Sequence, residues 1–117
     1  MVHGGFNRIE YEVMNKILEG DDPFHVLLRR QFSLAELRTR KFTGVGFYTY
    51  FSLPADVLRL KDRISGPLHG GPNAEIEGLK YGAGFVLFLK DGVIDNLEGF
   101  TYDEKWPTEV KSFRIIG

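Results

Sequence analysis

The chain has 117 residues, which is typical of one domain, and is 43% hydrophobic, 26% charged and 14% aromatic. This composition excludes a disordered chain, a collagen-like repeat and a coiled coil. The lack of cysteine excludes disulfides and thiolate sites, and the net charge of −1 provides no overall attraction to nucleic acid or membrane lipid. No run of about 20 apolar residues or signal peptide is evident. We expect a single cytoplasmic domain over residues 1–117, with a flexible N-terminus over residues 1–6.

Two short helices joined by a tight turn are expected in the first 32 residues. Asn7, followed three residues later by Glu10, is a capping-box pattern, and apolar residues then recur at a spacing of four. Gly20 predicts the end of the first helix and Pro23 the start of the second. The expected apolar faces are Ile9, Val13, Met14, Ile17 and Leu18 on the first helix, and Phe24, Leu27, Leu28 and Phe32 on the second.

After the second helix, the pattern becomes that of strands. Alternation in the segment 34–41 places Arg38 and Arg40 on the solvent side. Residues 55–73 are rich in glycine and proline and are expected to be mostly loop. The fold class is therefore α+β, with two N-terminal helices followed by a mostly antiparallel sheet of five or six strands. The expected strands are 34–41, 47–53, 74–76, 85–90, 93–102 and 112–116.

The segment 85–90 is the clearest strand. Both of its faces are apolar, so we expect a central strand covered on both sides, with Phe88 in the core. Asp91-Gly92 directly after it is a strong hairpin signal, and it predicts that residues 93–102 return antiparallel beside the first strand.

Charge is distributed unevenly along the chain. Residues 29–41 carry five basic side chains and one acidic one, and residues 91–104 carry five acidic side chains and no basic one. Either these segments are ordinary solvated surface, or the acidic one docks a partner protein. Tyrosine and tryptophan, which are favoured at interfaces, stand near the end of the acidic segment. The docking hypothesis names Asp95, Glu98, Tyr102, Asp103, Glu104 and Trp106, whereas the alternative places Trp106 in the core.

A nucleic-acid interface is a further possibility. The glycine-and-aromatic segment 44–50 follows Arg40 and Lys41, and it partly matches the RNP1 strand of RNA-recognition motifs. Thr43 and Val45 depart from that pattern, and both helices precede the sheet. We therefore predict that these aromatic side chains pack in the core, and that no specific nucleic acid binds.

In an alternative interpretation, the protein is a small-molecule or hydrolytic enzyme. It would use His69, which stands in a glycine-rich loop, together with Glu75 or Glu77. A cavity containing His69 would favour it. Asp95 and Glu98 fall on opposite faces of their strand unless a bulge intervenes, which argues against a paired-carboxylate site. The spacings typical of zinc sites, nucleophile elbows and dinucleotide sites are missing. The sequence therefore predicts no metal and no cofactor.

A family resemblance rests on four segments: the GxGF strand at 82–89, the turn at 91–92, the LEGFTY run at 97–102 and the WP pair at 106–107. Together with the corner at 42–47, they resemble a family of small uncharacterised bacterial proteins. The resemblance implies a bacterial cytoplasmic domain and assigns no functional residue. The lack of a catalytic motif and the acidic segment favour a non-enzymatic protein-binding module, and a toxin-neutralising role follows by fold-level analogy only.

Overall fold

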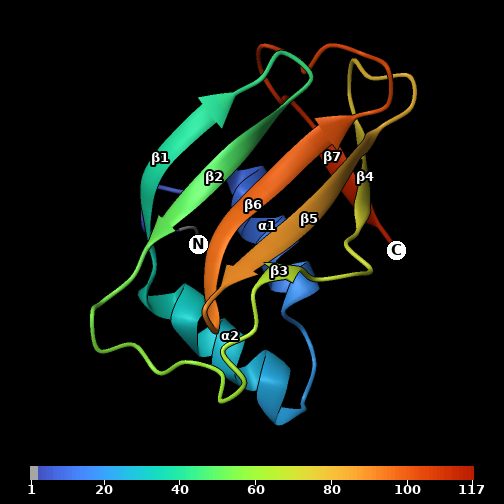
Figure 1. Cartoon of the computed structure of the whole chain (residues 1–117). Coiled ribbons are helices and arrows are strands. Elements are labelled where there is room, and N and C mark those ends of the chain that lie inside the picture. Colours follow the sequence, from blue (N-terminus) through green and yellow to red (C-terminus); the bar gives the residue numbers. More distant parts are fainter. Residues whose placement is uncertain (1–2) are drawn as a thin grey trace.

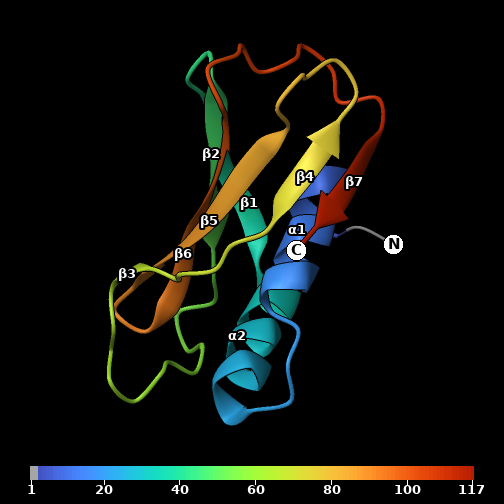
Figure 2. The ribbon, with the colours of Figure 1, turned by 90° about the vertical axis from the view of Figure 1, so that its right-hand side faces the viewer.

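The computed structural model describes residues 3–117 and has the predicted α+β fold. The sheet is antiparallel, with the strand order β1-β2-β6-β5-β4-β7 and with β3 paired to β5 (Figure 1). Both helices lie on one face of the sheet, which we call the inner face (Figure 2). The elements are α1 (Arg8–Ile17), α2 (Pro23–Leu34), β1 (Glu36–Phe42), β2 (Gly46–Ser52), β3 (Gly66–Pro67), β4 (Asn73–Ile76), β5 (Ala83–Lys90), β6 (Val93–Thr101) and β7 (Phe113–Ile116).

Both helices begin where the sequence predicts. The Glu10 N–H donates to Asn7 Oδ1 at 2.9 Å, and the Asn7 N–H donates to Glu10 Oε1 at 2.8 Å, which completes the capping box. Asp22 caps α2, whose first residue is Pro23. α1 ends at Ile17, earlier than the glycine signal predicts, and α2 continues through residue 34, so β1 starts two residues later than expected.

The core fills the space between the helices and the inner face of the sheet. The apolar stripes predicted for the helices point into it, and residues from β2, β5 and β6 meet them there. Burial of these side chains accounts for most of the hydrophobic stabilisation. The buried residues include Val13, Met14, Leu18, Leu28 and Phe32 from the helical region, and Phe47, Phe51, Phe85, Leu87, Leu89, Ile94 and Leu97 from the sheet.

The segment 3–6 is packed, although a flexible terminus was expected there. The Leu37 N–H donates to the Gly4 carbonyl at 2.7 Å, which attaches this segment to β1. Phe6 is 4% exposed, and its ring centroid lies 5.3 Å from that of Phe32. The aromatic contact explains why the segment is fixed. The first two residues of the expected flexible terminus lie outside the described residues.

A bulge in β1 reverses the predicted orientation of Arg40. The register between β1 and β2 shifts at Arg38, which makes this residue the extra one. Beyond the bulge, Arg40 lies opposite Thr49 on the inner face of the sheet. The prediction that Arg40 faces solvent is therefore wrong, because strict alternation does not hold across a bulge.

Arg40 is accommodated at the inner face by Glu10, whose side chain is 1% exposed. The two arginine nitrogens Nη2 and Nε approach the two carboxylate oxygens at 2.6 and 2.7 Å, and this pairing raises the pKa of Arg40. The Thr49 hydroxyl and the Asn7 N–H donate to the same carboxylate. Because both charges are hydrogen-bonded, the cost of removing them from water is offset, and the ion pair joins α1 to the sheet.

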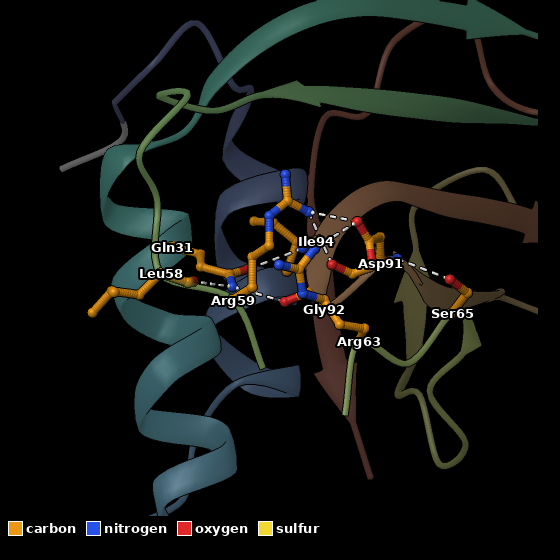
Figure 3. Close-up of polar contacts among 8 residues, drawn as sticks. All are labelled: Gln31, Leu58, Arg59, Arg63, Ser65, Asp91, Gly92 and Ile94. Carbon is orange, nitrogen blue, oxygen red and sulfur yellow. Dashed lines mark hydrogen bonds and ion pairs between the residues drawn. The ribbon is translucent and has the colours of Figure 1, made fainter. Parts of the chain in front are cut away.

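Residues 53–65, which form no helix or strand, are tied to the fold by Gln31 of α2 (Figure 3). The Gln31 side chain, 1% exposed as a residue, donates from Nε2 to the carbonyls of Leu58 and Gly92 at 2.8 and 3.1 Å. Its Oε1 accepts from the Ile94 N–H at 2.9 Å. One buried amide therefore holds a helix, a loop and a hairpin together, with its own polar atoms satisfied.

The β5–β6 hairpin turns at Asp91-Gly92, as predicted. These two residues have φ angles of 50° and 80°, the left-handed conformation that a tight two-residue hairpin turn requires. Arg59 and Arg63 approach Asp91 Oδ2 at 3.3 and 3.0 Å, and the Asp91 N–H donates to Ser65 Oγ at 2.8 Å (Figure 3). The hairpin tip thus holds the far end of the 53–65 segment.

No helix within residues 3–117 is long and apolar enough to cross a membrane.

Candidate functional site

The outer face of the sheet, which is turned away from α1 and α2, is covered by neither helix (Figures 1 and 2). β5 lies between β6 and β4, as predicted for a central strand. Its inner residues Phe85 and Leu87 are 2% and 0% exposed, but Val86 and Phe88 on the outer face are only partly buried. The expectation that β5 is covered on both sides, with Phe88 in the core, is therefore wrong.

Partly exposed aromatic and apolar side chains from β2, β5 and β6 make up the outer face. The residues are Tyr48, Tyr50, Val86, Phe88, Phe100 and, directly after β6, Tyr102. Tyr48 and Tyr50 stack with their ring centroids 6.3 Å apart. Core packing was predicted for this aromatic segment, and it holds for Phe47 but not for the two tyrosines, which alternate onto the opposite side.

Gly84 makes room for two of these rings over β5. A Cβ atom at this position would lie 2.6 Å from Phe100 Cζ and 2.6 Å from Tyr102 Oη. The Phe100 and Tyr102 rings meet edge to face with their centroids 5.6 Å apart, and the Tyr102 hydroxyl donates to Asn73 Oδ1 at 2.5 Å. Beside the rings, a cavity of about 270 Å³ is lined by these two residues and by the loop 67–73. The missing side chain thus lets the aromatic surface continue across the strand.

Four of the charged side chains on the outer face form two columns, one on each side of β2, and Glu36 at the start of β1 and Lys90 at the end of β5 share this face. The basic column consists of Arg38 and Lys41 on β1, whose cationic groups lie 5.3 and 5.7 Å from the centroid of the Tyr50 ring. The acidic column consists of Asp95 and Glu98 on β6. Within residues 3–117, no ion pair involves any of these four side chains.

The acidic column exists because β6 also contains a bulge. The register between β5 and β6 shifts between Phe88 and Leu89, which leaves Asp95 as the extra residue. Asp95 Oδ2 accepts from Asn96 Nδ2 at 2.8 Å, and Asn96 lies on the outer face. Strict alternation would place Asp95 and Glu98 on opposite faces of β6, whereas the bulge places both on the outer face.

Glu98 also affects its neighbour across the strand pair. It lies opposite Tyr48, and a hydrogen bond to the carboxylate, together with the negative charge, raises the pKa of Tyr48. The centre of the outer face therefore consists of carboxylates beside tyrosine rings.

The other predicted docking residues lie beyond the end of β6. Asp103 is exposed, with a φ of 67°. The Glu104 carboxylate accepts from the backbone N–H groups of residues 80–81, both at 2.9 Å, and these bonds lower the pKa of Glu104. Trp106 packs against Phe47 with the ring centroids 5.0 Å apart. Glu104 and Trp106 thus have contacts within the fold, and Trp106 is partly buried against the core.

The structure therefore brings three of the six predicted docking residues together on the outer face, namely Asp95, Glu98 and Tyr102. Sequence reasoning missed the aromatic residues that surround them, chiefly Phe88 and Phe100. One sequence signal for them was present, namely Gly84. A glycine in an otherwise bulky strand often marks a place where another group lies close to the backbone.

The structure separates His69 from the carboxylates of the enzymatic alternative. His69 lines cavities of about 400 and 270 Å³ on either side of the loop 67–73. Glu75 and Glu77 line a different, open cavity of about 720 Å³ beside β7, where Glu75 pairs with Arg114 at 2.5 Å. In the described part of the chain, no three histidine, aspartate or glutamate side chains are placed to hold a metal ion.

Comparisons of the chain with protein-family models, with curated protein sequences and with solved structures found no match.

Proposed function

We propose that this chain is a non-enzymatic, cytoplasmic bacterial protein-binding module that docks a partner protein through the outer face of its sheet. The observation that carries the proposal is the combination, on one uncovered face, of six partly exposed aromatic and apolar residues with four charges that have no ion-pair partner in residues 3–117. Exposed apolar patches with polar surroundings mark interaction sites, and tyrosine is enriched at their centres. By fold-level analogy alone, toxin neutralisation is one form of this function.

A protein fits this face better than a nucleic acid does. Aromatic rings on an open sheet can stack bases, but the phosphates must then lie near cationic side chains. Here Asp95 and Glu98 lie directly beside the tyrosines, on the side away from Arg38 and Lys41. Carboxylates at this place repel a phosphate backbone, whereas a protein partner can present a basic side chain to them.

Affinity capture with matched charge reversals tests the proposal. Tagged wild-type protein, Glu98→Lys and Glu77→Lys are each used as bait in bacterial extract containing an untagged copy of the chain, and bound proteins are quantified by mass spectrometry. Glu77 is exposed directly after β4, away from the strands β1, β2 and β6 that carry the two charge columns, so its variant makes the same charge change elsewhere.

We expect one protein to be recovered with wild type and Glu77→Lys and to be strongly reduced with Glu98→Lys, because reversing a charge at an interface slows association. Tyr48→Ala should reduce recovery through faster dissociation. Equal recovery with all baits, or none above background, would overturn the proposal.

A further inference from the structure

We propose that the partner on the outer face is a second copy of this chain, related by a twofold axis that runs parallel to β2 between two facing sheets. The inference rests on the proposed function, since it names the partner of the same surface. Its basis is the height at which the register places each charge along β2.

The first matching pair of charges consists of Lys41 and Glu98. Both residues are paired with Tyr48, Lys41 from the β1 side and Glu98 from the β6 side. They therefore lie at the same height along β2, one strand away from it in opposite directions. Neighbouring strands are about 4.8 Å apart, so the two columns are separated by roughly 10 Å.

The second matching pair consists of Arg38 and Asp95, the two bulge residues. Arg38 follows Leu37 and precedes the residue that pairs with Tyr50, and Asp95 precedes the residue that pairs with Tyr50 from the other side. Because β1 and β6 both run antiparallel to β2, both bulges lie beyond Tyr50 toward the same end of the sheet. The two columns thus carry opposite charges at the same height along β2 in two places.

A twofold rotation about an axis parallel to β2 exchanges the two sides of this strand and keeps the height along it. It places the basic column of one copy over the acidic column of the other, and the same contacts form a second time by symmetry. Lys41 then faces Glu98 of the second copy, and Arg38 faces Asp95. The stacked tyrosines face their counterparts at the axis, where facing sheets pack about 10 Å apart.

The same charges disfavour the other face-to-face dimer. A twofold axis in the same plane but perpendicular to the strands would place the basic column over a basic column, and the acidic over an acidic one. Like charges brought together in an interface are repulsive, so they select the arrangement parallel to β2. The helices lie on the inner faces and do not obstruct this dimer (Figure 2). Because the contact uses one face of three strands, we expect a weak dimer with micromolar dissociation.

Sedimentation velocity of the full-length protein over a wide concentration range tests the dimer. Wild type should change from monomer to dimer as concentration rises, and added salt should shift the change to higher concentration. Lys41→Glu and Glu98→Lys should each weaken dimerisation at least tenfold, because each variant opposes like charges twice. Glu77→Lys should dimerise as wild type does.

Two rescue experiments separate this geometry from simple misfolding. The double variant Lys41→Glu/Glu98→Lys exchanges the columns and should dimerise again. An equimolar mixture of the two single variants should form a heterodimer. In that heterodimer, the charges at positions 41 and 98 that face each other across the interface are opposite in sign at both contacts. Circular dichroism confirms that every variant is folded.

A wild-type protein that stays monomeric throughout, or a mixture that does not associate although wild type does, would overturn this inference. If the monomeric protein still loses a captured partner on Glu98→Lys, the proposed function stands and that partner is a different protein. If capture is also unaffected, both proposals fail.

Discussion

On the inner face of the sheet, the Glu10 carboxylate has an arginine on both oxygens and further donors from Thr49 and the backbone. Glu98 on the outer face, in contrast, forms no ion pair with any cation in residues 3–117. The aromatic residues show the same contrast, since Phe85 is enclosed and Phe88, three residues later on the other side, is not. The inner groups complete their interactions within the chain and stabilise the fold. The outer groups leave interactions available for association.

The largest expected difference between the faces is in side-chain packing. Phe85→Ala should lower the free energy of unfolding by about 3–5 kcal/mol, because it removes an enclosed ring and leaves a cavity. Phe88→Ala should lower it by less than about 2 kcal/mol, since part of that ring already contacts water. Urea denaturation of both variants checks this, and equal losses would show that the outer face is covered in solution.

Removing the inner carboxylate should have the next largest effect. Glu10→Gln leaves the Arg40 guanidinium without its counter-charge in a largely buried position, so we expect a loss of about 3 kcal/mol. Glu12→Gln is the matched control, because Glu12 pairs with Arg8 on the exposed side of the same helix and should cost less than about 1 kcal/mol. A similar denaturation midpoint for both variants would contradict the structural role of the Glu10–Arg40 pair.

Removing the outer carboxylate should change a titration more than the stability. Glu98→Gln should lower the pKa of Tyr48 toward its ordinary value, because both the hydrogen-bond acceptor and the negative charge weaken. In wild type, the folded pKa of Tyr48 is raised, so its stabilising contribution is complete below the unfolded pKa and is lost as pH rises through the folded pKa. NMR titration of labelled tyrosine rings measures the shift, and an unchanged Tyr48 pKa would contradict the contact.

Local sequence signals predicted much of this fold. The Asn7–Glu10 cap and the Asp91-Gly92 turn depend on residues close in the chain, and both form as expected. The bulges at Arg38 and Asp95 left no comparable signal, because they depend on pairing between strands. Strict alternation therefore assigned Arg40 to the wrong side and separated Asp95 from Glu98.

The extent of the core could not be predicted from local sequence patterns either. An apolar residue on each side of β5 indicates a central strand, but it does not distinguish a side covered by a helix of the same chain from one left for another molecule. Phe88 shows this difficulty, since its pattern is that of Leu87 and Leu89, while only those two are buried. The candidate site emerged only when the register placed separate strands side by side.

The attachment of the N-terminal segment to β1 has a consequence for aggregation. β1 ends the sheet on one side, and an unpaired edge strand offers backbone groups to any extended chain, which is how many fibrils grow. Here the Gly4 carbonyl occupies the Leu37 N–H, the bulge at Arg38 interrupts the edge, and Lys41 adds charge beyond it. At the opposite edge, β7 is four residues long. The protein thus closes the edges that would join strands indiscriminately and keeps open a face whose side chains can select a partner.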